Sequence, residues 1–393
     1  MHSVYGLTRR DFFRALSCGL CSCGLSSLPA PVARLYHCGE VWAAEPAVNT
    51  GLHEVMHYRK LPDMKIECEI CPKKCIIADL ERGYCGNKEN RGGTYYSLVH
   101  SQPCAVHVDP IEKKPLFHYL PDTQAFSIAA AGCNFECRFC QNWRIAQYRP
   151  EQIESMHIAP ADIVELSIAK NAPTIAYTYS EPVVFYGYMY DCAEQGRKKG
   201  IGSVMISNGF INEAPLQQLC RYLTGVKIDL KAFNDAFYRD YCSGELEPVL
   251  ATLKLLKKIN MWFEIVVLII PTLNDSRDEI SRMCAWIADN LGKDVPVHFS
   301  RFHPMYKIKN LPPTPLRTLE ECHSIAAAAG LHFVYLGNVP GHNAESTYCP
   351  RCKKVVIRRI GYVVAENNIR NGTCSHCGRP IPGVWKKPVP LGL

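Results

Sequence analysis

Between residues 126 and 336 the chain alternates short apolar segments, rich in β-branched side chains, with longer helical ones. The strand-like segments cover residues 126–131, 174–179, 203–207, 226–230, 262–270, 295–300 and 332–336, and the main helical ones cover 183–199, 213–222, 247–259, 278–291 and 319–329. Short strands joined by helices form right-handed β–α units with parallel strands. We therefore predict an α/β fold, with a partial (β/α)6 barrel in a core domain over residues 121–338 and the seventh strand as an appendage.

Polar residues gather where several of these strands end. The second strand ends in Tyr-Ser-Glu-Pro at residues 179–182, the third at Asn208, the fourth in Lys-Ile-Asp-Leu-Lys at residues 227–231, and the sixth at Arg301. The carboxyl ends of parallel strands lie at one edge of a sheet, and ligands bind there. The pattern predicts a ligand cradle, although each of these residues alone also fits a helix cap, a turn or a surface charge.

The 21 cysteines among 393 residues are too sparse for a disulfide scaffold and too frequent for core filling alone, so their spacing must decide their roles.

The net charge of +7 comes from scattered Lys and Arg residues that form no basic stripe, and no nucleic-acid partner is indicated. No apolar stretch is long enough for an integral membrane bundle.

One group of cysteines, Cys133-x3-Cys137-x2-Cys140, follows directly on the first strand of the core. A cubane iron–sulfur cluster needs four ligands, so three thiolates with no fourth nearby leave one iron open to bind something else. At the carboxyl end of a strand, such an open iron would lie where α/β enzymes carry out their chemistry. These three cysteines are therefore the predicted catalytic centre.

A second group, Cys68, Cys71, Cys75 and Cys85, lies in an N-terminal segment that we delimit as 56–120. Four thiolates within so short a stretch can wrap one tetrahedral ion or one iron–sulfur cluster, and the spacing does not separate the two. Two disulfides formed after export are the alternative.

A third group comprises two Cys-x2-Cys pairs, Cys349 with Cys352 and Cys374 with Cys377. Two such knuckles about 20 residues apart are typical of a zinc ribbon or a rubredoxin-like site. Residues 355–359 and 362–364 between them have the pattern of two short strands around Gly361. We predict a zinc-ribbon-like module over residues 345–386 with a structural zinc ion.

The remaining cysteines fall into two sets. Six are isolated in the sequence and are interpreted as small buried apolar residues, namely Cys104, Cys192, Cys220, Cys242, Cys284 and Cys322. The others, Cys18, Cys21, Cys23 and Cys38, lie in or beside a leader over residues 1–44. That leader carries a twin-arginine pattern, Thr-Arg-Arg-Asp-Phe-Phe-Arg at residues 8–14, which predicts export or membrane association of a folded protein. Translation from Met56 would make the protein cytoplasmic.

Several longer strings resemble one family. The cysteine loop with its aromatic Phe139, the string Asp-Pro-Ile-Glu-Lys-Lys-Pro-Leu-Phe-His at 109–118, Cys-Gln-Asn-Trp at 140–143, Tyr-Thr-Tyr-Ser-Glu-Pro at 177–182 and Thr-Tyr-Cys-Pro at 347–350 resemble the radical S-adenosylmethionine (SAM) superfamily. Within it they are most similar to the radical SAM component of the AmmeMemoRadiSam system, a relative of the pyruvate formate-lyase activating enzymes. The resemblance runs from about residue 56 to residue 385, and the leader departs from it.

The resemblance implies a 4Fe–4S cluster on Cys133, Cys137 and Cys140 whose open iron binds SAM. Glu181 matches the position of a glutamate that binds the methionine amino group, although the usual Gly-Gly-Glu string reads Tyr-Ser-Glu here. The other cofactor contacts that the resemblance implies are Asn208, Asp229, Lys231 and the backbone at Phe139.

The resemblance further implies reductive cleavage of SAM to a 5′-deoxyadenosyl radical, which abstracts hydrogen from a substrate. A low-potential electron donor of the flavodoxin or ferredoxin type is the expected partner. A glycyl-radical protein or proteins of the AmmeMemo system are further candidate partners. The alternative function is that of an exported iron–sulfur electron-transfer protein without SAM chemistry.

Overall fold

The computed structural model describes residues 52–391. The predicted leader over residues 1–44 lies outside the described residues. Within the described range, no helix has both the length and the apolar character needed to cross a membrane.

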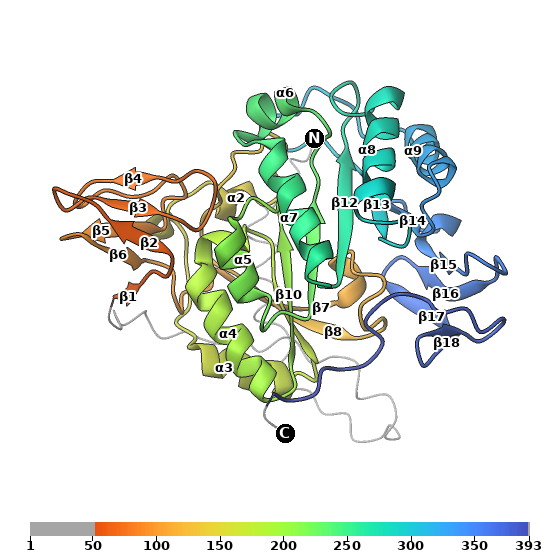
Figure 1. Cartoon of the computed structure of the whole chain (residues 1–393), viewed down its shortest axis with the longest axis horizontal. Coiled ribbons are helices and arrows are strands. Elements are labelled where there is room, and N and C mark those ends of the chain that lie inside the picture. The colour runs from red at the N-terminus through yellow and green to blue at the C-terminus, as the bar shows by residue number, and fades with distance from the viewer. Residues whose placement is uncertain (1–51, 392–393) are drawn as a thin grey trace, which may run out of the picture. The chain divides into compact units, whose positions relative to one another are not determined.

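A single eight-stranded sheet forms the centre of the fold (Figure 1). Its strands, in spatial order, are β14 (Val334–Gly337), β13 (Val297–Arg301), β12 (Phe263–Ile269), β11 (Gly225–Asp229), β10 (Gly202–Ser207), β9 (Thr174–Tyr177), β8 (Gln124–Ala129) and β7 (Ala105–Pro110). The strands β8 to β14 are parallel, and β7 pairs antiparallel with β8. The predicted α/β class with a parallel sheet is confirmed.

The prediction that the seventh strand is an appendage is wrong. The strand β14 pairs in parallel register with β13, with Ser300 opposite Gly337, and therefore extends the sheet. The strand β7 at the opposite edge was not predicted. Its sequence, Ala-Val-His-Val-Asp-Pro, includes the exposed His107 and Val108 and the polar Asp109, and this weakens the apolar signal.

The connections between the parallel strands are helices whose apolar faces pack on the sheet. They are α3 (Pro160–Ala169), α4 (Tyr186–Lys198), α5 (Glu213–Leu219), α7 (Leu246–Lys258), α8 (Arg277–Asn290) and α9 (Leu316–Ala328), with shorter turns α2 (Trp143–Ala146) and α6 (Asp235–Phe237). In α7 the buried residues Val249, Leu250, Leu253 and Leu256 recur at the spacing of one helix face. The Ser276 hydroxyl caps the start of α8 by accepting from the Glu279 backbone N–H at 3.3 Å.

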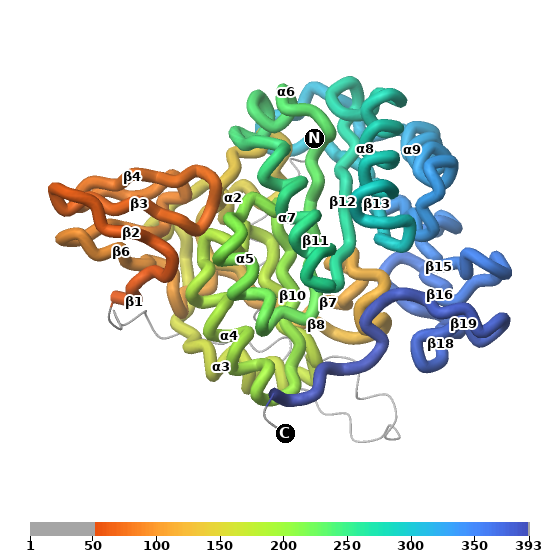
Figure 2. Tube along the Cα trace, in the orientation of Figure 1, coloured from red at the N-terminus to blue at the C-terminus, as the bar shows by residue number. Residues whose placement is uncertain are grey.

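Two small antiparallel sheets form the N-terminal part of the described chain. One contains β1 (His53–Glu54), β6 (Thr94–Ser97) and β5 (Lys88–Arg91), and the other contains β2 (Tyr58–Lys60), β3 (Ile66–Cys68) and β4 (Ile76–Ile77). Figure 2 traces this segment, which lines a cavity jointly with the end of α2.

The C-terminal part carries β15 (Thr347–Tyr348), β16 (Val355–Ile360), β17 (Val363–Asn367), β18 (Ile369–Arg370) and β19 (Thr373–Cys374). The antiparallel pair β16–β17 matches the two strands predicted around Gly361. The module packs on the core, because Val356 and Ile357 share a buried cluster with Phe117 and Tyr335. In addition, the buried Arg359 side chain donates a hydrogen bond to the Phe117 carbonyl at 2.7 Å.

Candidate active site

The cysteine loop leaves β8 through a tight backbone approach. Gly132 has φ +108°, and a Cβ atom at this position would lie 2.8 Å from the Cys85 carbonyl oxygen, so a larger residue would displace the loop. Cys133, Cys137 and Cys140 then line one cavity of about 560 Å³ at the carboxyl ends of the parallel strands. Their convergence on a cavity of this size fits a metal cluster together with a ligand as large as SAM.

A π-helical turn, η4 (Tyr238–Cys242), holds this loop from the far side. The backbone N–H groups of Glu136 and Arg138 donate to the carbonyl oxygens of Cys242 and Tyr241, each at 2.9 Å. The Cys242 thiol lies within hydrogen-bonding reach of Cys137, and this contact lowers the pKa of Cys137. Cys242 is buried, as predicted, but it neighbours the candidate cluster rather than filling a remote core. No local pattern reveals this, because the two cysteines are far apart in sequence.

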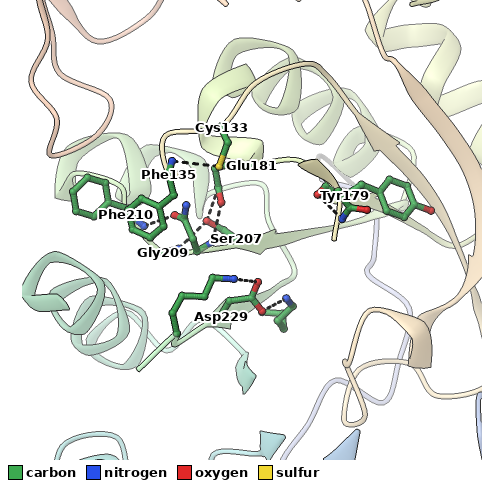
Figure 3. Close-up of polar contacts among 12 residues, drawn as sticks. Cys133, Phe135, Tyr179, Glu181, Ser207, Gly209, Phe210 and Asp229 are labelled. Carbon is green, nitrogen blue, oxygen red and sulfur yellow. Dashed lines mark hydrogen bonds and ion pairs between the residues drawn. The ribbon is translucent and has the colours of Figure 1, made fainter. Parts of the chain in front are cut away.

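The Asn208 side chain also positions the cysteine loop. Its side-chain N–H donates to the Asn134 side-chain oxygen at 2.8 Å, and the Asn134 amide donates in turn to the Phe210 carbonyl at 2.9 Å (Figure 3). Asn208, which the resemblance implies as a cofactor contact, lines the cavity. Its side chain, however, is already committed to positioning the residue that follows Cys133.

Glu181 lies beyond the end of β9, next to Cys133 (Figure 3). Its carboxylate accepts hydrogen bonds from the Ser207 hydroxyl at 2.7 Å, the Asn208 backbone N–H at 2.8 Å and the Val183 backbone N–H at 3.1 Å. Burial raises the pKa of Glu181 to about 7, although the hydrogen bonds oppose the rise. The result is a fixed carboxyl group that changes charge near neutral pH.

Asp229 ends β11 and lies between Lys227, on the same strand, and Lys231, two residues beyond its end. It forms ion pairs with Lys227 and, at 2.9 Å, with Lys231. Burial alone would raise the pKa of Asp229, but the two ammonium groups outweigh it and lower the pKa to about 2. Lys227 was not among the predicted site residues. The alternation of side chains along a strand places residues 227, 229 and 231 on one face and was the available signal.

Tyr179 precedes Glu181 and has φ +64°, a left-handed conformation that favours glycine. Its carbonyl oxygen accepts from the Asn142 side chain at 2.8 Å, and its phenol donates to Asp109. Lys114 lies 4.4 Å from the ring centroid. The backbone shape expected of a glycine-containing string is therefore present without the glycine, held by contacts from the cysteine loop and β7.

Phe139 lies between the second and third cysteines and is buried. Its ring packs on Phe237 of α6, with the centroids 5.7 Å apart, and the residue lines the cavity. The ring thus fastens the loop to α6.

The two outer cysteine groups differ in their spacing. In the C-terminal group the sulfur atoms of Cys349, Cys352, Cys374 and Cys377 all lie within 4.8 Å of one another. The Cys349–Cys377 and Cys352–Cys374 pairs are 3.6 and 3.8 Å apart. A tetrahedral zinc site with Zn–S bonds of about 2.3 Å separates its sulfurs by about 3.8 Å, so this group fits zinc.

The N-terminal group converges more loosely. The charges of Cys68, Cys71, Cys75 and Cys85 all act on the buried Tyr95 phenol, and together with burial they raise its pKa. Within the part of the chain that the structure describes, these four thiols do not form a group as close as the C-terminal one.

The comparisons with known proteins cover this same region. A model of the radical SAM superfamily matches residues 127–284. An uncharacterized protein of Methanocaldococcus jannaschii is 45% identical over 332 residues, which is 84% of this chain and 99% of that protein. A second uncharacterized protein of the same organism is 25% identical over 301 residues, or 70% of this chain and 81% of that protein.

Solved structures with a similar fold include radical SAM enzymes. A domain of pyruvate-formate lyase-activating enzyme from Bacteroides vulgatus has a TM-score of 0.37 and 15% identity, covering 42% of this chain and 98% of that one. A radical SAM methyltransferase from Sphaerobacter thermophilus has a TM-score of 0.42 and 14% identity, covering 56% of this chain and 67% of that one.

Proposed function

The chain belongs to the radical SAM superfamily, and on this premise we propose that it is an enzyme that abstracts hydrogen from a substrate with a SAM-derived radical. One observation carries the proposal. Cys133, Cys137 and Cys140 open on the same cavity as Glu181 and Asp229, at the carboxyl ends of strands that we take to act as a partial barrel. An electron carrier without SAM chemistry would have no use for these polar strand ends, so the alternative function is not favoured.

In this proposal Cys133, Cys137 and Cys140 hold the 4Fe–4S cluster. When bound, the cluster supplies one electron to the sulfonium of SAM, whose C–S bond breaks to give methionine and a 5′-deoxyadenosyl radical. The Glu181 carboxylate accepts a hydrogen bond from the amino group of the methionine part of SAM. The Phe139 backbone contacts adenine at the cavity wall. The aromatic side chains of the loop exclude water from the cavity.

Asp229, Lys227 and Lys231 form a preorganised charged group on the cavity wall. Because the aspartate stays ionised and is flanked by ammonium groups, the group can bind the polar parts of SAM or of the substrate without rearrangement. We assign Asp229 and Lys231 to this contact, as the sequence predicted, and add Lys227.

The substrate is proposed to approach through an adjoining cavity of about 650 Å³. This cavity shares Lys113, Gln141, Asn142 and Tyr179 with the first one and also contains Trp143 and Arg144. A protein that receives a glycyl radical is the candidate suggested by the relatedness to activating enzymes. A peptide or small molecule handled with AmmeMemo-system proteins is the second candidate, and no nucleic acid is proposed.

The remaining expectations are part of the same proposal. A zinc ion on the zinc-ribbon-like C-terminal module has a structural role, because its four cysteines leave no open position. A flavodoxin or ferredoxin supplies the electrons. The leader directs export or membrane association if it is translated and functional, and the enzyme is cytoplasmic if translation starts at Met56.

The test is a spectroscopic titration of anaerobically reconstituted, reduced protein with SAM. The electron paramagnetic resonance spectrum of the catalytic cluster should change on SAM addition, because the open iron gains ligands. Cys137→Ala should abolish that signal, and Cys220→Ser, at an isolated cysteine, should leave it unchanged. A wild-type cluster spectrum that is insensitive to SAM would refute the proposal.

A further inference from the structure

The N-terminal cysteine group touches the back of the catalytic loop. The Asn87 side chain, two residues after Cys85, donates a hydrogen bond to the Ala131 carbonyl at 2.7 Å. The Cys85 carbonyl oxygen lies 2.8 Å from the position that a Cβ of Gly132 would take. Cys85 and Cys133 also line one shared cavity of about 710 Å³. The segment that carries Cys85 therefore contacts the catalytic loop directly.

The four N-terminal thiols come from several elements and all act on the buried Tyr95 phenol. Cys68 lies on β3, the Cys75 sulfur accepts from the Tyr84 backbone N–H at 3.4 Å, and the Cys85 sulfur accepts from the Lys88 ammonium at 3.4 Å. Lys88 is 4% exposed, so this cation is buried beside the sulfur. Hydrogen bonds and positive charge next to a cluster's sulfur ligands raise its reduction potential, so Lys88 would tune a cluster held here.

The C-terminal group can be compared with the N-terminal group for the spacing of its sulfur atoms. Its four sulfurs lie as close together as the ligands of one tetrahedral ion, and the N-terminal four do not. Cys133, Cys137 and Cys140, the proposed cluster ligands, are likewise absent from the close groups of the described residues. A cubane places several iron atoms between its ligands and requires the wider arrangement.

Three of the four cysteine residues are partly exposed. Cys71, Cys75 and Cys85 are half-buried, whereas Cys68 is buried. The N-terminal group is thus open on one side and contacts the catalytic loop on the other. In this position a redox centre accepts electrons on its exposed side and transfers them towards Cys133.

From these contacts we propose that Cys68, Cys71, Cys75 and Cys85 hold a second iron–sulfur cluster, which passes electrons to the catalytic cluster. The inference rests on the proposed function. A reduced flavodoxin or ferredoxin gives up one electron to the second cluster, which passes it through the Asn87–Ala131 contact to the catalytic cluster. Each SAM cleaved consumes one such electron, and the second cluster returns to its oxidised form.

The first experiment measures metal content in the full chain after anaerobic reconstitution. Cys71→Ser/Cys75→Ser should lose the second cluster, so that iron falls towards the four atoms of one cubane while zinc stays constant. Cys220→Ser is the matched control and should keep all its iron. Zinc loss with unchanged iron in the double variant would overturn the proposal.

The second experiment separates the relay from catalysis. With dithionite, a small reductant that can reach the catalytic cluster directly, the double variant should still form 5′-deoxyadenosine. With reduced flavodoxin or ferredoxin as the donor it should not. Equal activity with the protein donor would refute the relay. Failure of wild type with dithionite would instead refute the proposed function.

A milder variant guards against misfolding of the double variant. Lys88→Met removes the buried cation beside Cys85 while keeping all four cysteines. A redox titration followed by electron paramagnetic resonance should show one midpoint potential shifted to more negative values and the catalytic potential unchanged. If no signal other than that of the catalytic cluster titrates, the second cluster does not exist.

Discussion

Glu181 is a buried carboxyl group whose oxygens accept hydrogen bonds from Ser207, Asn208 and Val183. Three donors fix both carboxylate oxygens, so the side chain keeps its orientation when a ligand binds. In the proposed function, its position beside Cys133 makes it the residue that contacts the methionine end of SAM. Two predictions follow from its geometry and its charge.

Glu181→Gln removes the charge while keeping the shape of the side chain. A hydrogen bond to a charged group contributes about 1.5–3 kcal/mol, so we expect SAM to bind about tenfold or more weakly. The measurement is the dissociation constant of SAM on the reconstituted protein. Glu213→Gln, on the exposed surface of α5, is the control. Equal affinity in Glu181→Gln and wild type would exclude a direct contact.

The affinity for SAM should also depend on pH. Because the folded pKa of Glu181 is raised to about 7, the group is mostly protonated below pH 7 and must lose a proton before it can accept the amino group. We expect affinity to rise from pH 6 to pH 8, and to rise less in Glu181→Gln. A wild-type affinity that is flat over this range would contradict the assignment.

At the scale of elements, the cysteine loop owes its shape to segments far away in the sequence. The π-helical turn η4 holds the backbone of Glu136 and Arg138, and Gly244 just after it makes room for Phe135. π-helical turns occur preferentially at functional sites, and here the turn supplies a scaffold for the loop. Its geometry should therefore control whether the cluster assembles.

Gly244→Ala tests this scaffold. A Cβ atom at residue 244 would lie 2.3 Å from the Phe135 ring, so the ring and the loop must shift. We expect a loss of about 1–3 kcal/mol of unfolding free energy and a lower yield of reconstituted cluster. Gly196→Ala in α4 is the matched control, because its nearest neighbour lies 3.5 Å away and alanine favours a helix. Thermal unfolding and iron content are the measurements, and equal iron in the two variants would refute the scaffold role.

At the scale of the whole molecule, the C-terminal module is fastened to the core by a buried polar network. Arg359 donates to the Phe117 carbonyl at 2.7 Å, and the His118 ring is hydrogen-bonded to the Pro382 carbonyl at 2.7 Å. The proposed zinc ion orders the module that carries Arg359. Loss of the ion should therefore lower the free energy of unfolding of the whole chain, and not only that of the module.

Cys374→Ser should remove zinc and lower the melting temperature by several degrees, since a loss of about 1 kcal/mol lowers it by about 2–4 °C in a large domain. Metal analysis and calorimetry together provide the test. Iron content should stay at the wild-type level. A variant that keeps its zinc would show that this group does not hold the ion.

The sequence patterns predicted the parallel sheet and most helices, because strongly periodic apolar segments identify buried elements. They missed β7, since an edge strand with exposed residues such as Val108 lacks that signal. They also placed β14 outside the sheet, because pairing partners are decided by tertiary packing. Spacing identified the cysteine groups, but Cys242 joined the site only once the fold brought distant segments together, and Lys227 was missed although it lies two residues before Asp229 on β11.

Product analysis tests the central claim most directly. Wild-type protein, reconstituted anaerobically and reduced with dithionite, is incubated with SAM, and 5′-deoxyadenosine and methionine are quantified together. We predict that both products form in equal amounts, that Cys137→Ala forms neither, and that Cys220→Ser matches wild type. Absence of 5′-deoxyadenosine from the wild-type reaction, or its undiminished formation by Cys137→Ala, would contradict the account.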